Sequence, residues 1–152
     1  MVIKVMYYGF QKTYKFDTFS DLINNDNYDN IIYLNCSNND LTMLPNKLPK
    51  GLLYFDCANN KITSLPSLPD SLDVLICCNN LIESLPNLPP KLRILWCFHN
   101  MITEIENIPM SILDLDCSHN KLTKIPISPN PLAEIDYTMN NIDIDIYLDS
   151  SG

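Results

Sequence analysis

The sequence predicts a mostly β solenoid, in which a repeated unit of about 20 residues adds one short strand at a time to a parallel sheet. An asparagine recurs six times, first after 21 residues and then every 20, at Asn39, Asn60, Asn80, Asn100, Asn120 and Asn140. Three residues before them stand Cys36, Cys57, Cys77, Cys97, Cys117 and Tyr137. Leucine and isoleucine keep fixed offsets around these markers, as expected if each unit buries its apolar edge against its neighbours.

The repeated unit reads L-x-x-L-x-C-x-x-N-x-L-x-x-L-P. We number its positions from the first leucine, so that Leu52, Cys57 and Asn60 stand at positions one, six and nine. Six units are predicted over residues 31–147, each with a strand near positions three to seven. The asparagine at position nine is predicted to be architectural, because its amide can satisfy backbone groups of the turn and of the neighbouring coil.

This unit resembles the short, proline-containing (LPX-type) leucine-rich repeat. Similar repeats occur in effectors of enteric bacterial pathogens and in leucine-rich-repeat proteins of giant DNA viruses. The resemblance covers about residues 31 to 147 and implies a parallel sheet on a concave face, with a role in modulating host proteins. The many Asn, Ile, Lys and Tyr residues are typical of an AT-rich genome, which fits a giant virus.

Residues 1–30 lie outside the repeats and are predicted to form an N-terminal cap. Apolar and polar residues alternate over 3–7 and again over 12–16, which predicts a β-hairpin. Thr18, followed three residues later by Asp21, resembles a capping box and predicts a short helix. Such a cap would cover the exposed core and strand edge at the open end of the solenoid.

The segments between the strands contain prolines about every three residues, as in LPSLPDSL and LPNLPPKL. Closely spaced prolines block helix and favour extended, polyproline-like backbone, which we expect on the convex side. After Asn140, Ile142, Ile144 and Ile146 alternate with aspartates and predict a last strand, followed by a tail over 148–152.

Five of the six cysteines occupy position six, which faces the core. We therefore predict a ladder of buried free thiols in a reducing compartment. Neighbouring rungs are near disulfide spacing, but their parallel side chains make the required dihedral angle awkward. No C-x-x-C pair suggests zinc. We expect no metal and no cofactor.

The composition excludes other classes of function. The net charge of -8 disfavours nucleic acid as a partner, because nucleic-acid binders present clustered Lys and Arg. No segment approaches the about 20 apolar residues of a membrane span, and the N-terminus does not read as a signal peptide. We expect a cytoplasmic protein, located in the host cytoplasm if it is viral.

Positions three, five and seven are predicted to project from the concave face. The predicted partner-binding residues on this face are Tyr33, Tyr54, Asp56, Val74, Ile76, Cys78, Ile94, Trp96, Phe98, Asp114, Asp116, Glu134 and Asp136. We call Tyr54, Val74, Ile76, Cys78, Ile94, Trp96 and Phe98 the apolar patch, and Asp114, Asp116, Glu134 and Asp136 the acidic flank. Exposed apolar patches with Trp and Tyr are typical of protein-binding sites, so we expect a partner protein with an apolar and basic surface.

Other interpretations use the same residues. The apolar patch could instead join identical chains in a structural or self-assembling homodimer. His99, His119 and Asp116 could hold a metal, but position eight is asparagine in three other repeats, which favours polar edge residues. Cys78, expected to point outward, could be a nucleophile, but nothing in the sequence supplies an activating base. We therefore predict a protein without catalytic activity.

Overall fold

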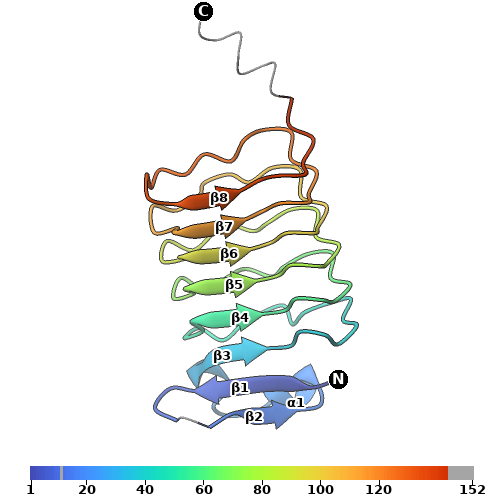
Figure 1. Ribbon diagram of the computed structural model, residues 1–152. Coiled ribbons are helices and arrows are strands. Elements are labelled where there is room, and N and C mark those ends of the chain that lie inside the picture. Colours follow the sequence, from blue (N-terminus) through green and yellow to red (C-terminus); the bar gives the residue numbers. More distant parts are fainter. Residues whose placement is uncertain (11, 144–152) are drawn as a thin grey trace, which may run out of the picture.

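The computed structural model describes residues 1–10 and 12–143, and it contains one eight-stranded sheet with the order β2-β1-β3-β4-β5-β6-β7-β8 (Figure 1). The strands are β1 (Ile3–Tyr7), β2 (Tyr14–Phe16), β3 (Ile31–Asn35), β4 (Tyr54–Asp56), β5 (Val74–Ile76), β6 (Ile94–Trp96), β7 (Asp114–Asp116) and β8 (Glu134–Asp136). The helices are α1 (Phe19–Ile23) and the 3₁₀ turn η1 (Tyr28–Asn30). Strands β3 to β8 are parallel, which confirms the predicted solenoid.

Equivalent repeat positions lie side by side because successive strands pair without an offset. Tyr54 pairs with Val74, and Val74 pairs with Ile94. Each position of the repeat therefore forms a column across the sheet. Strands β4 to β8 cover only positions three to five, so they are shorter than the predicted span of positions three to seven.

The core consists of the columns at positions one, four, six and eleven. In the second repeat these residues are Leu52, Phe55, Cys57 and Ile62, and all four are fully buried. The last repeat has no following repeat among the described residues, and its position-one side chain, Leu132, is exposed. Each repeat therefore depends on its neighbours for burial, as in other solenoids.

The asparagines at position nine join each repeat to the one before it. Nδ2 of Asn80 donates to the carbonyl oxygens of Cys77 and Cys78 in its own turn, at 3.1 and 3.3 Å, and to that of Cys57 in the preceding repeat, at 3.0 Å. Oδ1 of Asn80 accepts the backbone N–H of Ile62 at 3.0 Å. Asn80 is only 6% exposed, so these bonds satisfy backbone groups that water does not reach.

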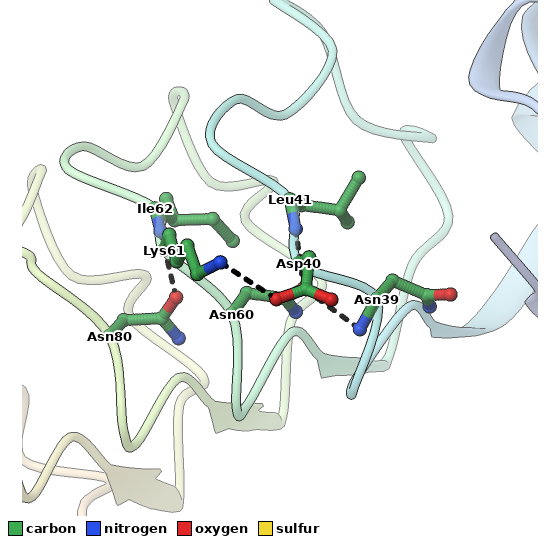
Figure 2. Close-up of polar contacts among 7 residues, drawn as sticks. All are labelled: Asn39, Asp40, Leu41, Asn60, Lys61, Ile62 and Asn80. Atoms are coloured by element: carbon green, nitrogen blue, oxygen red, sulfur yellow. Dashed lines mark hydrogen bonds and ion pairs between the residues drawn. The ribbon is translucent and has the colours of Figure 1, made fainter.

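The same pattern repeats along the chain (Figure 2). Oδ1 of Asn60 accepts the N–H groups of Asn39 and Leu41, at 3.1 and 2.9 Å. The first member of the column has no preceding repeat, and its side chain bonds the cap instead. Asn39 accepts from the backbone N–H of Val2 and donates to its carbonyl, at 2.7 and 2.9 Å. These contacts confirm the predicted architectural role.

The N-terminal residues form the predicted hairpin and helix. Strand β1 pairs antiparallel with both β2 and β3, so the cap continues the sheet and occupies the free edge of β3. Ile3, Val5 and Leu22 of the cap are fully buried against the first repeat. The hydroxyl of Thr18 begins α1 by accepting the backbone N–H of Asp21 at 3.0 Å.

Within the described residues, the segments between strands contain no helix from β3 onward. Their prolines account for this, as predicted. The predicted last strand and the tail over 148–152 lie outside the described residues, except Ile142 and Asp143, which have no regular structure. Among the described residues, no helix has the length and apolar character that a membrane crossing requires.

All six cysteines are free and buried. Burial raises the pKa of every thiol, and for Cys36 and Cys117 it does so to about 12. Desolvation of the charged thiolate is the largest cause in each case, because these side chains pack in an apolar column. The cysteines are therefore poor nucleophiles in the folded protein and act as small apolar side chains.

Replacing Asn80 by alanine is expected to lower the free energy of unfolding by about 2 to 4 kcal/mol, because several buried backbone groups lose their partner at once. Urea denaturation of the variant and the native protein measures this change. Asn87→Ala, the same substitution at an exposed site, is the control and should change stability by less than about 0.5 kcal/mol. Equal losses in the two variants would contradict the architectural role.

The buried thiols are expected to make the fold sensitive to alkali. A thiol whose pKa is raised by folding stabilises the protein below the unfolded pKa of about 8.5 and loses this contribution as pH rises toward the folded value of about 12. The free energy of unfolding should therefore fall steadily above about pH 8.5.

Urea denaturation at a series of pH values measures this dependence. Cys97→Ala removes one buried thiol and should reduce the slope against pH by about one proton, whatever its effect on stability at neutral pH. A slope equal to that of the native protein would show that the buried thiols do not cause the alkaline loss.

Candidate protein-binding surface

Each of the strands β4 to β7 buries its middle residue and turns its two flanking residues to the opposite face of the sheet. In β4, Phe55 is buried and Tyr54 and Asp56 are partly exposed, and β5 to β7 follow the same alternation. Because the strands pair in register, the predicted residues at positions three and five form two neighbouring columns. The structure therefore brings these columns together on one face, which we call the concave face.

Aromatic side chains lie along the concave face. The rings of Tyr33 and Tyr54 stack with their centroids 4.7 Å apart. Trp96 is 37% exposed, and its indole Nε1 donates to Oδ2 of Asp114 at 3.0 Å. This hydrogen bond holds the tryptophan at the boundary between the apolar patch and the acidic flank, where it joins an apolar surface to a charged one.

The acidic residues at position five also hold the turn that follows each strand. Oδ1 of Asp116 accepts the backbone N–H of Ser118 at 3.0 Å, and Oδ1 of Asp136 accepts that of Thr138 at 2.9 Å. Asp56 does the same for Ala58. Aspartate and asparagine favour such turns because their short side chains reach the backbone two residues on. These residues are therefore architectural as well as charged, a role that the prediction missed.

Position five is apolar in the two central repeats. Ile76 and Trp96 occupy the place where the other four repeats have Asn35, Asp56, Asp116 and Asp136. Neither Ile76 nor the apolar ring of Trp96 can accept the N–H of position seven, so these two repeats lack the side-chain acceptor. These two repeats therefore have partly exposed apolar surface in place of a hydrogen bond that holds the turn.

The acidic flank keeps its charge unneutralised by lysine or arginine within the described residues. The salt bridges there join Lys50 to Asp29, Lys61 to Asp40 and Arg93 to Asp73, all outside the flank. The backbone and hydroxyl hydrogen bonds from Thr138 hold the pKa of Asp136 below its usual value, so this carboxylate is charged at neutral pH. The flank can therefore attract a basic group.

Position seven differs from the prediction. Ala58, Cys78 and Ser118 are buried, and Cys78 is only 6% exposed. The expectation of an exposed Cys78 is therefore wrong. The strand ends at position five, so the alternation that would turn position seven outward does not continue that far. Phe98 is the one large side chain in this column, and it is partly exposed.

Position eight has left-handed backbone in every repeat. The positive φ values, between 51° and 58°, belong to Asn38, Asn59, Asn79, His99, His119 and Met139. Asparagine tolerates this conformation well and histidine is also enriched in it, which explains the residues found there. Asparagine in three of the six repeats was the sequence signal for this turn.

The two histidines at position eight stack on each other. Their ring centroids are 4.1 Å apart, and both side chains are exposed. Within residues 1–10 and 12–143, no group of three or more His, Cys, Asp or Glu is arranged to hold a metal ion. The left-handed turn accounts for the histidines without a ligand.

No protein-family model matches the sequence, and no curated protein matches it. Several solved structures do match this chain. The leucine-rich-repeat domain of a Shigella effector is 30% identical, with a TM-score of 0.69 over 72% of this chain and 50% of that one. YopM from Yersinia enterocolitica is 34% identical, with a TM-score of 0.70 over 74% of this chain and 25% of that one.

YopM from Yersinia pestis, described as a leucine-rich effector protein, is 32% identical, with a TM-score of 0.63 over 68% of this chain and 30% of that one. The chain thus spans half or less of the length of these three structures. The likeness nevertheless extends over about 70% of this chain. The chain is a leucine-rich-repeat solenoid, and its repeats resemble those of the Shigella and Yersinia effectors.

Proposed function

We propose that this protein binds another protein through the concave face and has no catalytic activity of its own. Leucine-rich-repeat folds of this kind serve as protein-interaction modules. The proposal depends mainly on position five, where the two central repeats have an apolar residue in place of the Asn or Asp of the other repeats. Ile76 and Trp96 replace residues that would hold a turn, and they do so in adjacent repeats, where the two residues pair across β5 and β6. Stability alone does not explain such a choice.

The surface indicates the chemistry of the partner. An apolar patch centred on Trp96 suits an apolar anchor, since tryptophan is enriched at the energetic centres of interfaces. The acidic flank beside it suits a lysine or arginine next to that anchor. Binding should weaken as salt increases, because the flank is exposed and therefore screened. By analogy with the effectors, we propose a host protein in the host cytoplasm as partner, with a virus or another pathogen as the source.

The cysteine chemistry supports a role without catalysis. Cys78, which was predicted to belong to the apolar patch, is buried, and burial raises the pKa of its thiol, whereas an activated nucleophile needs a lowered pKa. The acidic residues at position five are already engaged by the backbone of the turns. These features favour recognition over a reaction.

The substitution Trp96→Asn tests whether a polar residue at position five would hold the turn in this repeat. An asparagine there should accept the N–H of Phe98, as Asn35 accepts that of Ser37 at 3.1 Å. We expect Trp96→Asn to be more stable than Trp96→Ala by about 1 kcal/mol in urea denaturation, the net value of one hydrogen bond. If the alanine variant is as stable as the asparagine variant, position five does not hold the turn in this repeat.

The binding role is tested by quantitative affinity capture from host-cell extract, followed by titration of the purified partner. Trp96→Asn should lower the affinity for that partner at least about tenfold, as expected for the centre of an interface. Met110→Asn is the control, because it replaces an exposed apolar residue outside the concave face. A partner that binds Trp96→Asn and the native protein equally would place recognition elsewhere.

A further inference from the structure

The cap extends the concave face by two strands. Lys4 of β1 pairs with Asn35 of β3 and with Lys15 of β2, so the three side chains lie on one face of the sheet. The neighbouring residues Ile3 and Val5 are buried on the other face. Both lysines are exposed. We call Lys4 and Lys15 the basic end.

The concave face therefore has an ordered sequence of chemical character. The basic end on β2 and β1 comes first, the stacked tyrosines of β3 and β4 follow, and the apolar patch continues over β5 and β6. The acidic flank on β7 and β8 closes the series. No salt bridge in the described part of the chain includes a residue of the basic end or of the acidic flank.

The basic end and the acidic flank lie at opposite ends of the concave face. Two copies of the face that run in opposite directions would therefore bring opposite charges together. We propose that the concave face also closes on a second copy of the chain, so that two chains form a homodimer with their solenoids antiparallel. The inference rests on the proposed function in one respect, since both use the concave face. It goes further by naming an occupant and its orientation.

A twofold axis parallel to the strands, between β4 and β5, gives this arrangement. It places β2 over β8 and β1 over β7. Because Lys4 and Lys15 lie level with Asn35 at position five, Lys15 of one chain faces Asp136 of the other and Lys4 faces Asp116. It also places β3 over β6, which brings Tyr33 opposite Ile94 and Asn35 opposite Trp96. Such a contact is isologous, the usual form in a dimer. A twofold axis along the solenoid would instead set like charges against each other.

The dimer is expected to be weak. Eight strands spaced by about 4.8 Å and mostly three residues long present roughly 400 Å² per chain. A standard stable interface buries about 800 Å² per partner. The dimer should therefore form reversibly at high protein concentration, and a tighter partner should displace it. Self-association would then cover the apolar patch when no partner is present.

Sedimentation equilibrium of the full chain, from micromolar to millimolar concentration and at low and high salt, tests the proposal. We expect a dimer that dissociates on dilution and weakens with salt. Lys15→Glu sets acid against acid, and Asp136→Lys sets base against base. Each should weaken the dimer about tenfold, because both contacts of the symmetric pair change from attraction to repulsion. The combined variant Lys15→Glu, Asp136→Lys restores opposite charges and should restore the native dissociation constant.

The combined variant makes the test independent of folding. A variant that merely lost structure could not recover on addition of the second substitution, and urea denaturation checks each protein. The proposal is overturned if the native chain stays monomeric at millimolar concentration, or if the combined variant dimerises no better than the single ones. Neither result touches the proposed function, which depends on loss of the captured partner in Trp96→Asn. Conversely, a dimer with the expected charge response would stand even if no partner were captured.

Discussion

The whole structure depends on the side-chain amide at position nine. A solenoid of 20-residue coils must turn sharply after each strand, and the turn buries carbonyl and N–H groups that cannot reach water. One asparagine satisfies several of them at once, in its own turn and in the preceding coil, as Asn80 does. The amide therefore fixes the shape of each coil and also its register with the next one. The columns of the sheet, the buried cysteines and the concave face all follow from this register.

The framework leaves few positions free for function, and even these are partly engaged. Asp116 and Asp136 carry the charge of the acidic flank, but they also accept the N–H that follows their strand. Only the two central repeats give up this acceptor, at Ile76 and Trp96. The surface that we propose for binding therefore lies where the repeat departs from its own pattern. A repeat protein can tolerate this departure because its stability is spread over many similar interfaces.

The cap has a structural and an electrostatic consequence. It protects the edge of β3 and closes the asparagine column through Val2. Because it does so by continuing the sheet, it also places Lys4 and Lys15 on the same face as the acidic flank. The concave face is thereby polarised along the solenoid, and any partner is expected to bind in a preferred direction.

The sequence by itself determined the solenoid, the buried cysteine column, the role of the asparagines and the hairpin with its short helix, because a period of 20 residues places equivalent side chains in equivalent surroundings. It did not determine where the strands end. Cys78 was expected to be exposed and is buried, because the chain leaves the sheet after position five. The left-handed turn at His99 and the hydrogen bonds of the position-five aspartates were decided by backbone geometry, which strand alternation does not describe. The shared face of Lys4 and Asp114 depends on strand pairing between distant segments, and only the tertiary structure establishes that pairing.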